Sequence, residues 1–158
     1  MGKGPPPAKS PMQIRAARPA DFPDLLRLIR AYYRYDSIRF RAKLVAEGLR
    51  EMLRNRACGQ MWIMRDGERA IGYVAFSFHH DAEFGGRQGV ITDLFIRSAY
   101  RGRGLGAIML ATVDDYCRLA GIRSMELQVI HGNRAAEAFY RKHGFRRLER
   151  TIMARELT

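Results

Sequence analysis

Seven residues that combine backbone freedom with positive charge, RGRGLGA, stand at positions 101–107, directly before a helical pattern. The start of a helix leaves backbone N–H groups without partners and carries roughly half a positive charge, so it favours an anion. Gly102, Gly104 and Gly106 let the backbone curl around a phosphate, and the two arginines add charge. The spacing predicts a diphosphate site, with an ordinary glycine-rich turn as the alternative.

The same glycines also fit a dinucleotide-binding fingerprint, because Gly102, Gly104 and Ala107 satisfy G-x-G-x-x-A and Glu126 follows about twenty residues later. Three observations argue against this fingerprint. The segment RSAYR separates the apolar strand pattern ending at Ile96 from the first glycine, Glu126 falls within a strand pattern, and too few residues follow for a doubly wound sheet. A diphosphate on a different fold is the better interpretation.

Periodic apolar patterns predict the elements that must hold this loop. Alternation predicts strands, and a 3.6-residue period with capping signals predicts helices, Asp21 being placed to cap the first of them. The expected strands cover 12–17, 60–66, 69–78, 89–96, 124–130 and 146–157, and the expected helices cover 18–33, 41–55, 105–120 and 133–143. A loop is expected at 79–88. The order β-α-α-β-β-β-α-β-α-β predicts an α/β (α+β) domain, a mixed sheet with helices on its faces.

Length and composition limit the class of protein. The 158 residues, 47% of them hydrophobic, suffice for one domain over 12–158, and four of the six prolines lie in 1–11, which predicts a flexible N-terminal tail. The absence of a long apolar run predicts a soluble cytoplasmic protein with no membrane partner. Cys58 and Cys117 lack metal-site spacing, so we expect reduced packing residues and no metal.

The chain is strongly basic, with 28 Lys and Arg against 16 Asp and Glu and a formal net charge of +12. Such a charge favours an anionic partner. The sequence has no RNP motif, zinc finger or basic-leucine pattern, so we expect no nucleic-acid partner. Charge alone does not identify the anion.

Two motifs together resemble the GCN5-related N-acetyltransferase (GNAT) superfamily: ITDLFIRSAYRGRGLGAIML at 91–110 and HGNRAAEAFYRKHGF at 131–145. Arg101, Gly104 and Gly106 match its Arg/Gln-x-x-Gly-x-Gly/Ala signature. The second motif is matched by Asn133, Ala136, Phe139, Tyr140, Gly144 and Phe145. The resemblance covers about residues 12 to 157 and implies the GNAT fold. That fold is a mixed, mostly antiparallel sheet of about six to seven strands, splayed between the fourth and fifth, with about four helices.

The resemblance implies acetyl-CoA as co-substrate, its diphosphate on the amides of 102–107. It also implies that the pantetheine arm pairs with the backbone of 94–96 as an extra strand, because the next strand splays away. Asn133 would hold the arm from the other side. The implied cofactor-binding residues are Leu94, Phe95, Ile96, Arg101, Gly102, Arg103, Gly104, Leu105, Gly106, Ala107 and Asn133.

The implied reaction is direct transfer of an acetyl group to an amine, which needs a neutral amine, a stabilised oxyanion and a proton for the departing thiolate. Tyr140 matches the tyrosine that faces the sulfur and is the expected acid, with packing beside Phe139 as the alternative. A backbone N–H near Leu94 or Phe95 is the expected oxyanion donor.

Asp93 is the expected base, because Val90 and Thr92 on the same strand cannot ionise. Simple alternation puts Asp93 on the face opposite Thr92 and Leu94 unless a bulge turns the strand, so an ion pair with an arginine is an equal alternative. Gln128 stands where some relatives carry glutamate. Other candidate bases are Glu126, Glu83, His79 and His80.

The resemblance implies a small-molecule primary amine as acceptor, such as an amino acid or polyamine, and it allows a homodimer. Asp36, Asp81 and Glu83 could hold a cationic amine, whereas Arg39 and Arg87 could hold a carboxylate. The alternative function is a non-catalytic module on the same fold that senses acyl-CoA or binds nucleic acid through its basic surface.

Overall fold

The computed structural model describes residues 12–157, so the tail expected at 1–11 lies outside the described residues. The chain divides into two compact units with the boundary after Gln128, and each is described by itself. The expectation of a single domain stays a prediction.

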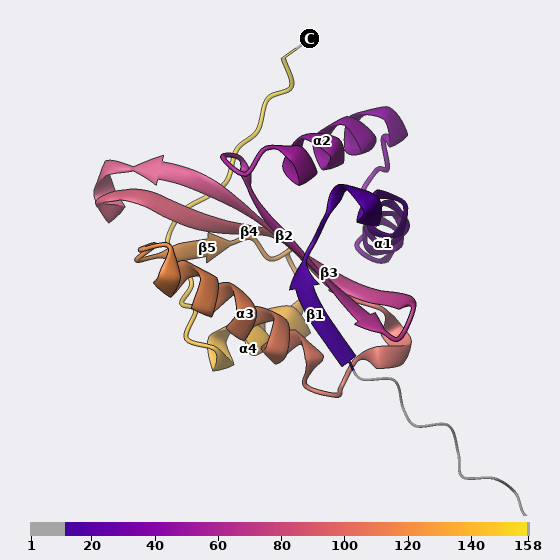
Figure 1. Ribbon diagram of the computed structural model, residues 1–158. Helices are drawn as coiled ribbons and strands as arrows, with labels where there is room; N and C mark the ends of the chain where they lie inside the picture. The colour runs from indigo at the N-terminus through magenta and orange to yellow at the C-terminus, as the bar shows by residue number, and fades with distance from the viewer. Residues whose placement is uncertain (1–11, 158) are drawn as a thin grey trace, which may run out of the picture. The chain divides into compact units, whose positions relative to one another are not determined.

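The first unit is built on a five-stranded sheet in the order β1-β2-β3-β4-β5 (Figure 1). Neighbouring strands from β1 to β4 are antiparallel, and β5 is parallel to β4. The strands are β1 Met12–Ala16, β2 Gly59–Asp66, β3 Arg69–Asp81, β4 Gly86–Ile96 and β5 Met125–Leu127. This confirms the expected mixed, mostly antiparallel sheet.

Three α-helices belong to the first unit, and a fourth belongs to the second. They are α1 Phe22–Tyr35, α2 Ala42–Arg54, α3 Leu105–Leu119 and α4 Arg134–Lys142. Short 3-10 turns lie at η1 Pro19–Asp21, η2 Ala82–Phe84 and η3 Ser98–Tyr100. Each predicted helix is therefore present, with ends shifted by a few residues. Among the described residues no helix is long and apolar enough to cross a membrane.

The helices of the first unit cover both faces of the sheet (Figure 1). On one face, Leu25 and Leu28 of α1 are fully buried in a cluster with Tyr73 of β3 and Phe95 of β4. On the other face, Tyr116 of α3 packs edge-on against strand aromatics, including Trp62 at 5.1 Å between ring centroids. Apolar stripes spaced at the helical period produce this burial.

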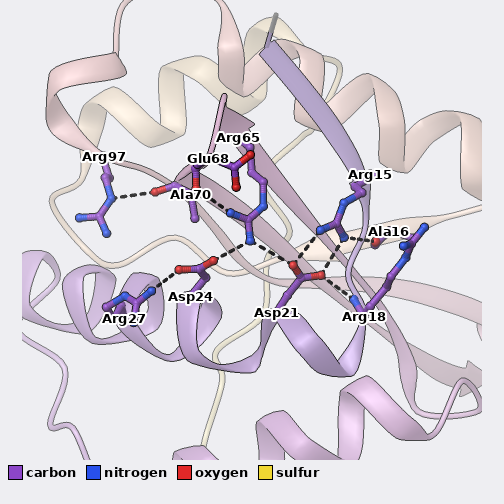
Figure 2. Close-up of polar contacts among 10 residues, drawn as sticks. All are labelled: Arg15, Ala16, Arg18, Asp21, Asp24, Arg27, Arg65, Glu68, Ala70 and Arg97. Carbon is purple, nitrogen blue, oxygen red and sulfur yellow. Dashed lines mark hydrogen bonds and ion pairs between the residues drawn. The ribbon is translucent and has the colours of Figure 1, made fainter. Parts of the chain in front are cut away.

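A cluster of charged residues holds the start of α1 against β1 and β2 (Figure 2). Asp21 is buried, and its carboxylate accepts hydrogen bonds from Arg15 at 2.7 and 2.8 Å and from Arg65 at 3.1 Å. It also accepts a bond from the Arg18 amide at 2.8 Å, while its side chain caps no amide of α1. The hydrogen bond from Arg15 is the main cause that lowers the pKa of Asp21. Asp21, which we expected to cap the helix, instead joins the start of α1 to β1 and β2.

Two segments differ from the expectation. Residues 145–157 form no strand, so the sheet has five strands rather than six or seven. Apolar side chains do not alternate regularly there, and Ile152 and Met153 are 64% and 90% exposed. The loop expected at 79–88 is mostly strand, because β3 and β4 continue pairing through His80 and Arg87 to a turn at η2.

The cysteines lie in different places and are both free. Cys117 is buried in α3, and burial raises the pKa of its thiol to about 11. At neutral pH this thiol is protonated and behaves as a small apolar side chain.

The second unit contains α4, which begins after Asn133. The Asn133 side chain accepts a hydrogen bond from the Ala136 amide at 3.1 Å, as its expected role as a cap requires. Tyr140 lies between two aromatic rings, with centroids 5.1 Å from Phe139 and 5.6 Å from Phe145.

Candidate active site

A β-bulge in β4 decides which way the candidate base points. Ala75 of β3 pairs with Asp93, but the next residue, Phe76, pairs with Ile91, so Thr92 is an extra residue in β4. Without this insertion Asp93 would face α3, as simple alternation predicts. With it, Thr92 and Asp93 both face the side of the sheet covered by α1 and α2, where both line one pocket.

The two halves of β4 differ on the edge that faces β5. Gly89, Val90 and Ile91 pair with Met125, Glu126 and Leu127, and this pairing ends at Ile91. Leu94, Phe95 and Ile96 pair with β3 on their other edge, but no described residue of β5 pairs with them. This is the expected splay between the fourth and fifth strands. It leaves a strand edge that an extended ligand could join.

The glycine-rich loop leads from η3 into α3. Gly102 and Gly104 have φ angles of 73° and 75°, in the left-handed region where a Cβ atom causes strain. A Cβ built on either would meet no atom within 4 Å, so the space beside the loop is open. Gly104 is the N-cap of α3, and no side chain among residues 12–157 caps the helix. The first amides, at 105–107, are therefore available to an anion.

The two arginines of the loop have contacts of their own. Arg101 donates from Nε to the Ile96 carbonyl at 2.8 Å, and its guanidinium lies 4.0 Å from the centroid of the Tyr35 ring. Arg103 donates to the Ala99 carbonyl at 3.0 Å. The Arg101 side chain thus holds the loop against the ends of β4 and α1, and the Arg103 side chain holds it against η3.

A pocket of about 460 Å³ opens between α1, α2 and the bulge of β4. Most of its lining is apolar, and the polar or charged lining residues are Tyr33, Arg39, Arg41, Thr92 and Asp93. Arg39 and Arg41 are exposed, whereas Asp93 is partly buried. All of these residues belong to the first unit.

The electrostatic environment of Asp93 raises the pKa of its carboxyl group. Burial is the main cause, since it removes water from the charged form, and the nearby charge of Asp36 acts in the same direction. A hydrogen bond from the Tyr73 hydroxyl, 2.9 Å from Asp93 Oδ2, acts in the opposite direction. A carboxylate in this setting is a stronger base than an exposed one.

Tyr73 is a partner of the candidate base that sequence reasoning missed. Its side chain is fully buried in β3, and burial raises the pKa of its hydroxyl well above the ordinary value, so it remains a hydrogen-bond donor to Asp93. A signal was available, because a tyrosine within a fully apolar strand needs a partner for its hydroxyl. The identity of that partner depends on the strand register.

The other candidate bases and substrate contacts lie outside the pocket lining. His79, His80 and Glu83 are exposed on the β3–β4 hairpin, and Glu126 lies in β5. Arg87 lies 3.5 Å from the centroid of the Phe78 ring. Of the residues expected to hold an acceptor, only Arg39 lines the pocket.

Asn133 and Tyr140, the remaining predicted site residues, belong to the second unit. Asn133 uses its side-chain oxygen as the cap of α4, which leaves its amide nitrogen as a donor. Tyr140 is half-buried beside Phe139. Their predicted roles toward acetyl-CoA stay predictions.

Comparison with known proteins gives curated relatives that are N-acetyltransferases. An uncharacterized N-acetyltransferase of Methanocaldococcus jannaschii is 27% identical over 138 residues, which cover 86% of this chain and 61% of that protein. The chain thus matches about three fifths of that relative's length. The thialysine N-epsilon-acetyltransferase of Bos taurus is 26% identical over 148 residues, 84% of this chain and 83% of the relative.

Solved structures with the same fold include an aminoglycoside N-acetyltransferase, AAC(6')-Iy, in complex with CoA. It superimposes with a TM-score of 0.82 over 95% of this chain and 97% of its own, at 21% sequence identity. The model of the acetyltransferase (GNAT) family matches residues 22–145, which include the glycine-rich loop, the bulged strand and α4. This match spans most of the sequence, so the chain belongs to the acetyltransferase (GNAT) family.

Proposed function

We propose that the protein transfers the acetyl group of acetyl-CoA to the primary amine of a small molecule bound in the pocket between α1, α2 and β4. The observation that carries this proposal is the position of Asp93. Its carboxylate, with a raised pKa, lines the pocket two residues beyond the point where β4 loses its pairing with β5. The bovine relative named for thialysine and the similar fold named for aminoglycosides both act on amines.

The residues of the first unit suit acetyl-CoA. The open space beside Gly102 and Gly104 and the uncapped amides at 105–107 provide backbone donors for a diphosphate. The edge of 94–96 provides donors and acceptors for an extended amide-containing arm. Acetyl-CoA, when bound, supplies a thioester whose carbon–sulfur bond breaks as the carbon–nitrogen bond to the amine forms.

Two residues are proposed to move protons. Asp93 takes the proton that the amine must lose, directly or through a water molecule, because its surroundings make it more basic than an exposed aspartate. Tyr140 donates a proton to the departing sulfur, a role supported by its place in the second motif. The ordinary pKa of tyrosine, near ~10, keeps the group protonated at neutral pH.

The test is an assay of free thiol released from acetyl-CoA in the presence of a panel of primary amines. We expect turnover with at least one amine, and we expect Tyr140→Phe to lower kcat by about a hundredfold, a usual contribution of a general acid. Tyr116→Phe, which removes one hydroxyl from α3, is the matched control and should leave kcat unchanged. CoA binding without turnover on any amine would refute the proposal and favour an acyl-CoA sensor.

A further inference from the structure

We infer that the pocket selects an acceptor that carries an anionic group, such as a carboxylate, separated from its primary amine by an apolar segment, and that it rejects polycationic amines. This inference rests on the proposed function and narrows its substrate class. It follows from the distribution of charge and apolar surface within the pocket.

The charged residues of the pocket differ in sign and in exposure. Asp93 is the one acidic residue among the described residues of the lining, and its hydrogen bond ties it to the fully buried Tyr73. Arg39 and Arg41 also line the pocket, but both are exposed. The pocket therefore presents a carboxylate at its sheet side and guanidinium groups toward solvent. A ligand with one positive and one negative end matches this arrangement.

The lining that accompanies these charges is apolar. Seven hydrophobic side chains from both helices and two strands contribute to it: Ile29, Leu44, Val45, Leu49, Met52, Met61 and Ala75. Polar groups of a ligand placed against these side chains would lose water without gaining hydrogen bonds. The segment that joins the two charged ends of the acceptor is therefore expected to be a hydrocarbon chain or ring.

The same features disfavour a polycation such as an aminoglycoside. Several ammonium groups would need several carboxylates, whereas the described lining offers Asp93 alone together with two arginines. Like charges placed close together in an interface repel each other and weaken binding. The net charge of +12 on the chain also repels a polycation at long range. Of the substrates named for similar proteins, thialysine carries a carboxylate besides its two amines, whereas aminoglycosides carry several amines and no carboxylate.

The experiment compares acceptors that share a six-carbon chain and differ in the far end: aminocaproate, hexylamine and hexamethylenediamine, with kanamycin as the polycation. Initial rates with acetyl-CoA give kcat/KM for each amine. We expect aminocaproate to exceed hexylamine by about tenfold, the effect of one charge-assisted hydrogen bond to the carboxylate. The diamine and kanamycin should rank below hexylamine.

Variants at Arg39 test the origin of this preference. Arg39→Glu should reverse the order, so that hexamethylenediamine exceeds aminocaproate, and Arg39→Gln should remove most of the tenfold advantage. Arg54→Glu makes the same change of charge on α2 outside the pocket lining and should keep the wild-type order. An unchanged order in both Arg39 variants, or a wild-type preference for the diamine or kanamycin, overturns the inference.

A binding measurement separates failure of the inference from failure of the proposed function. Thermal unfolding is followed with each amine at matched concentration, since a ligand that binds only the folded state raises the midpoint. Stabilisation by aminocaproate that Arg39→Glu abolishes supports the pocket's selectivity even when no amine is acetylated, in which case only the catalytic proposal fails. Acetylation that favours polyamines leaves the catalytic proposal intact and refutes the inference. Absence of both turnover and stabilisation refutes both.

Discussion

Asp21 and Asp93 lie in the same unit, and in both cases the protein removes water from a carboxylate, but their neighbours are opposite. Asp21 is surrounded by donors, two of them the arginines Arg15 and Arg65, and its pKa is lowered. Asp93 receives one hydrogen bond from a tyrosine, within residues 12–157 it takes part in no ion pair, and its pKa is raised.

The difference separates a structural carboxylate from the one that we propose as the base. A buried carboxylate paired with arginines holds its charge tightly, which makes it a good anchor and a poor proton acceptor. A carboxylate without such a partner is costly to bury, and the cost makes it basic. The fold thus uses one residue type for two purposes by changing the charge around it.

The largest expected effect is the loss of activity in Asp93→Asn. The amide keeps an acceptor for the Tyr73 hydroxyl but cannot take a proton, so we expect kcat to fall by about a hundredfold or more. Steady-state rates with the best acceptor of the panel measure this fall. A variant with wild-type kcat would show that Asp93 is not the base, and the proposed functional difference between Asp93 and Asp21 would then be wrong.

The same variant should be more stable than the wild type at neutral pH. Because the folded-state pKa of Asp93 is raised, the free energy of unfolding falls as pH rises from the ordinary value near 3.8 through the folded value, and stays lower above it. Removing the charge removes this loss. Urea denaturation at neutral pH should therefore show a higher midpoint for Asp93→Asn.

Asp21→Asn should have the opposite effect on stability. It leaves Arg15 and Arg65 without their buried partner, so we expect the free energy of unfolding to fall by about 3 kcal/mol. The stabilisation by Asp21 is present above its ordinary pKa and is lost as pH falls from there through the lowered folded value. The variant should therefore show a weaker loss of stability in acid, and kcat of the folded fraction should not change.

Tyr73→Phe tests how the hydrogen bond from Tyr73 affects the pKa of Asp93. Loss of the hydroxyl removes a hydrogen bond that favours the charged carboxylate, so the pKa of Asp93 should rise further. A base must be deprotonated to act, and the acid limb of the kcat/KM profile should therefore move to higher pH. We expect a plateau near the wild-type rate and a stability change of about 1 kcal/mol. An acid limb that stays in place would contradict the assignment of that limb to Asp93.

The smallest effect on stability is expected at Asp24, in the cluster of charged residues at the start of α1. Asp24 contacts Arg65 at 2.5 Å and also pairs with Arg27, but its side chain is 24% exposed, so water partly replaces these bonds when they are lost. We expect Asp24→Asn to lower the free energy of unfolding by about 1 kcal/mol, well below the loss in Asp21→Asn. Equal losses in the two variants would show that burial does not set the strength of this cluster.

The order of elements and the conformation of the glycine-rich loop could be predicted from the sequence, because both depend on local signals. Alternation, helical periods and capping residues act over a few positions, and the glycines at 102 and 104 are placed where the backbone needs positive φ. The match of two motifs in the expected order identified the family.

The orientation of Asp93 and the role of Asp21 could not be predicted, because each depends on contacts that no local pattern contains. The bulge at Thr92 has no glycine or proline to mark it, and it appears only when β4 is aligned with β3. Arg65 lies 44 positions from Asp21, so a local helix-cap pattern could not predict the hydrogen bond between them. The expected strand at 146–157 was wrong because its polar and apolar residues fit no regular period.

Arg101 links the glycine-rich loop to the end of α1, which borders the proposed amine pocket. Its guanidinium lies on the ring of Tyr35, the last residue of α1, while its Nε holds the end of β4. If an amine bound in the pocket displaces the end of α1, we expect these contacts to carry the displacement to the glycine-rich loop. Thermodynamic linkage requires the effect to be mutual, so CoA should change the affinity for the amine by the same factor as the amine changes the affinity for CoA. Calorimetric titrations in both orders would measure that factor, and Arg101→Ala should bring it close to one.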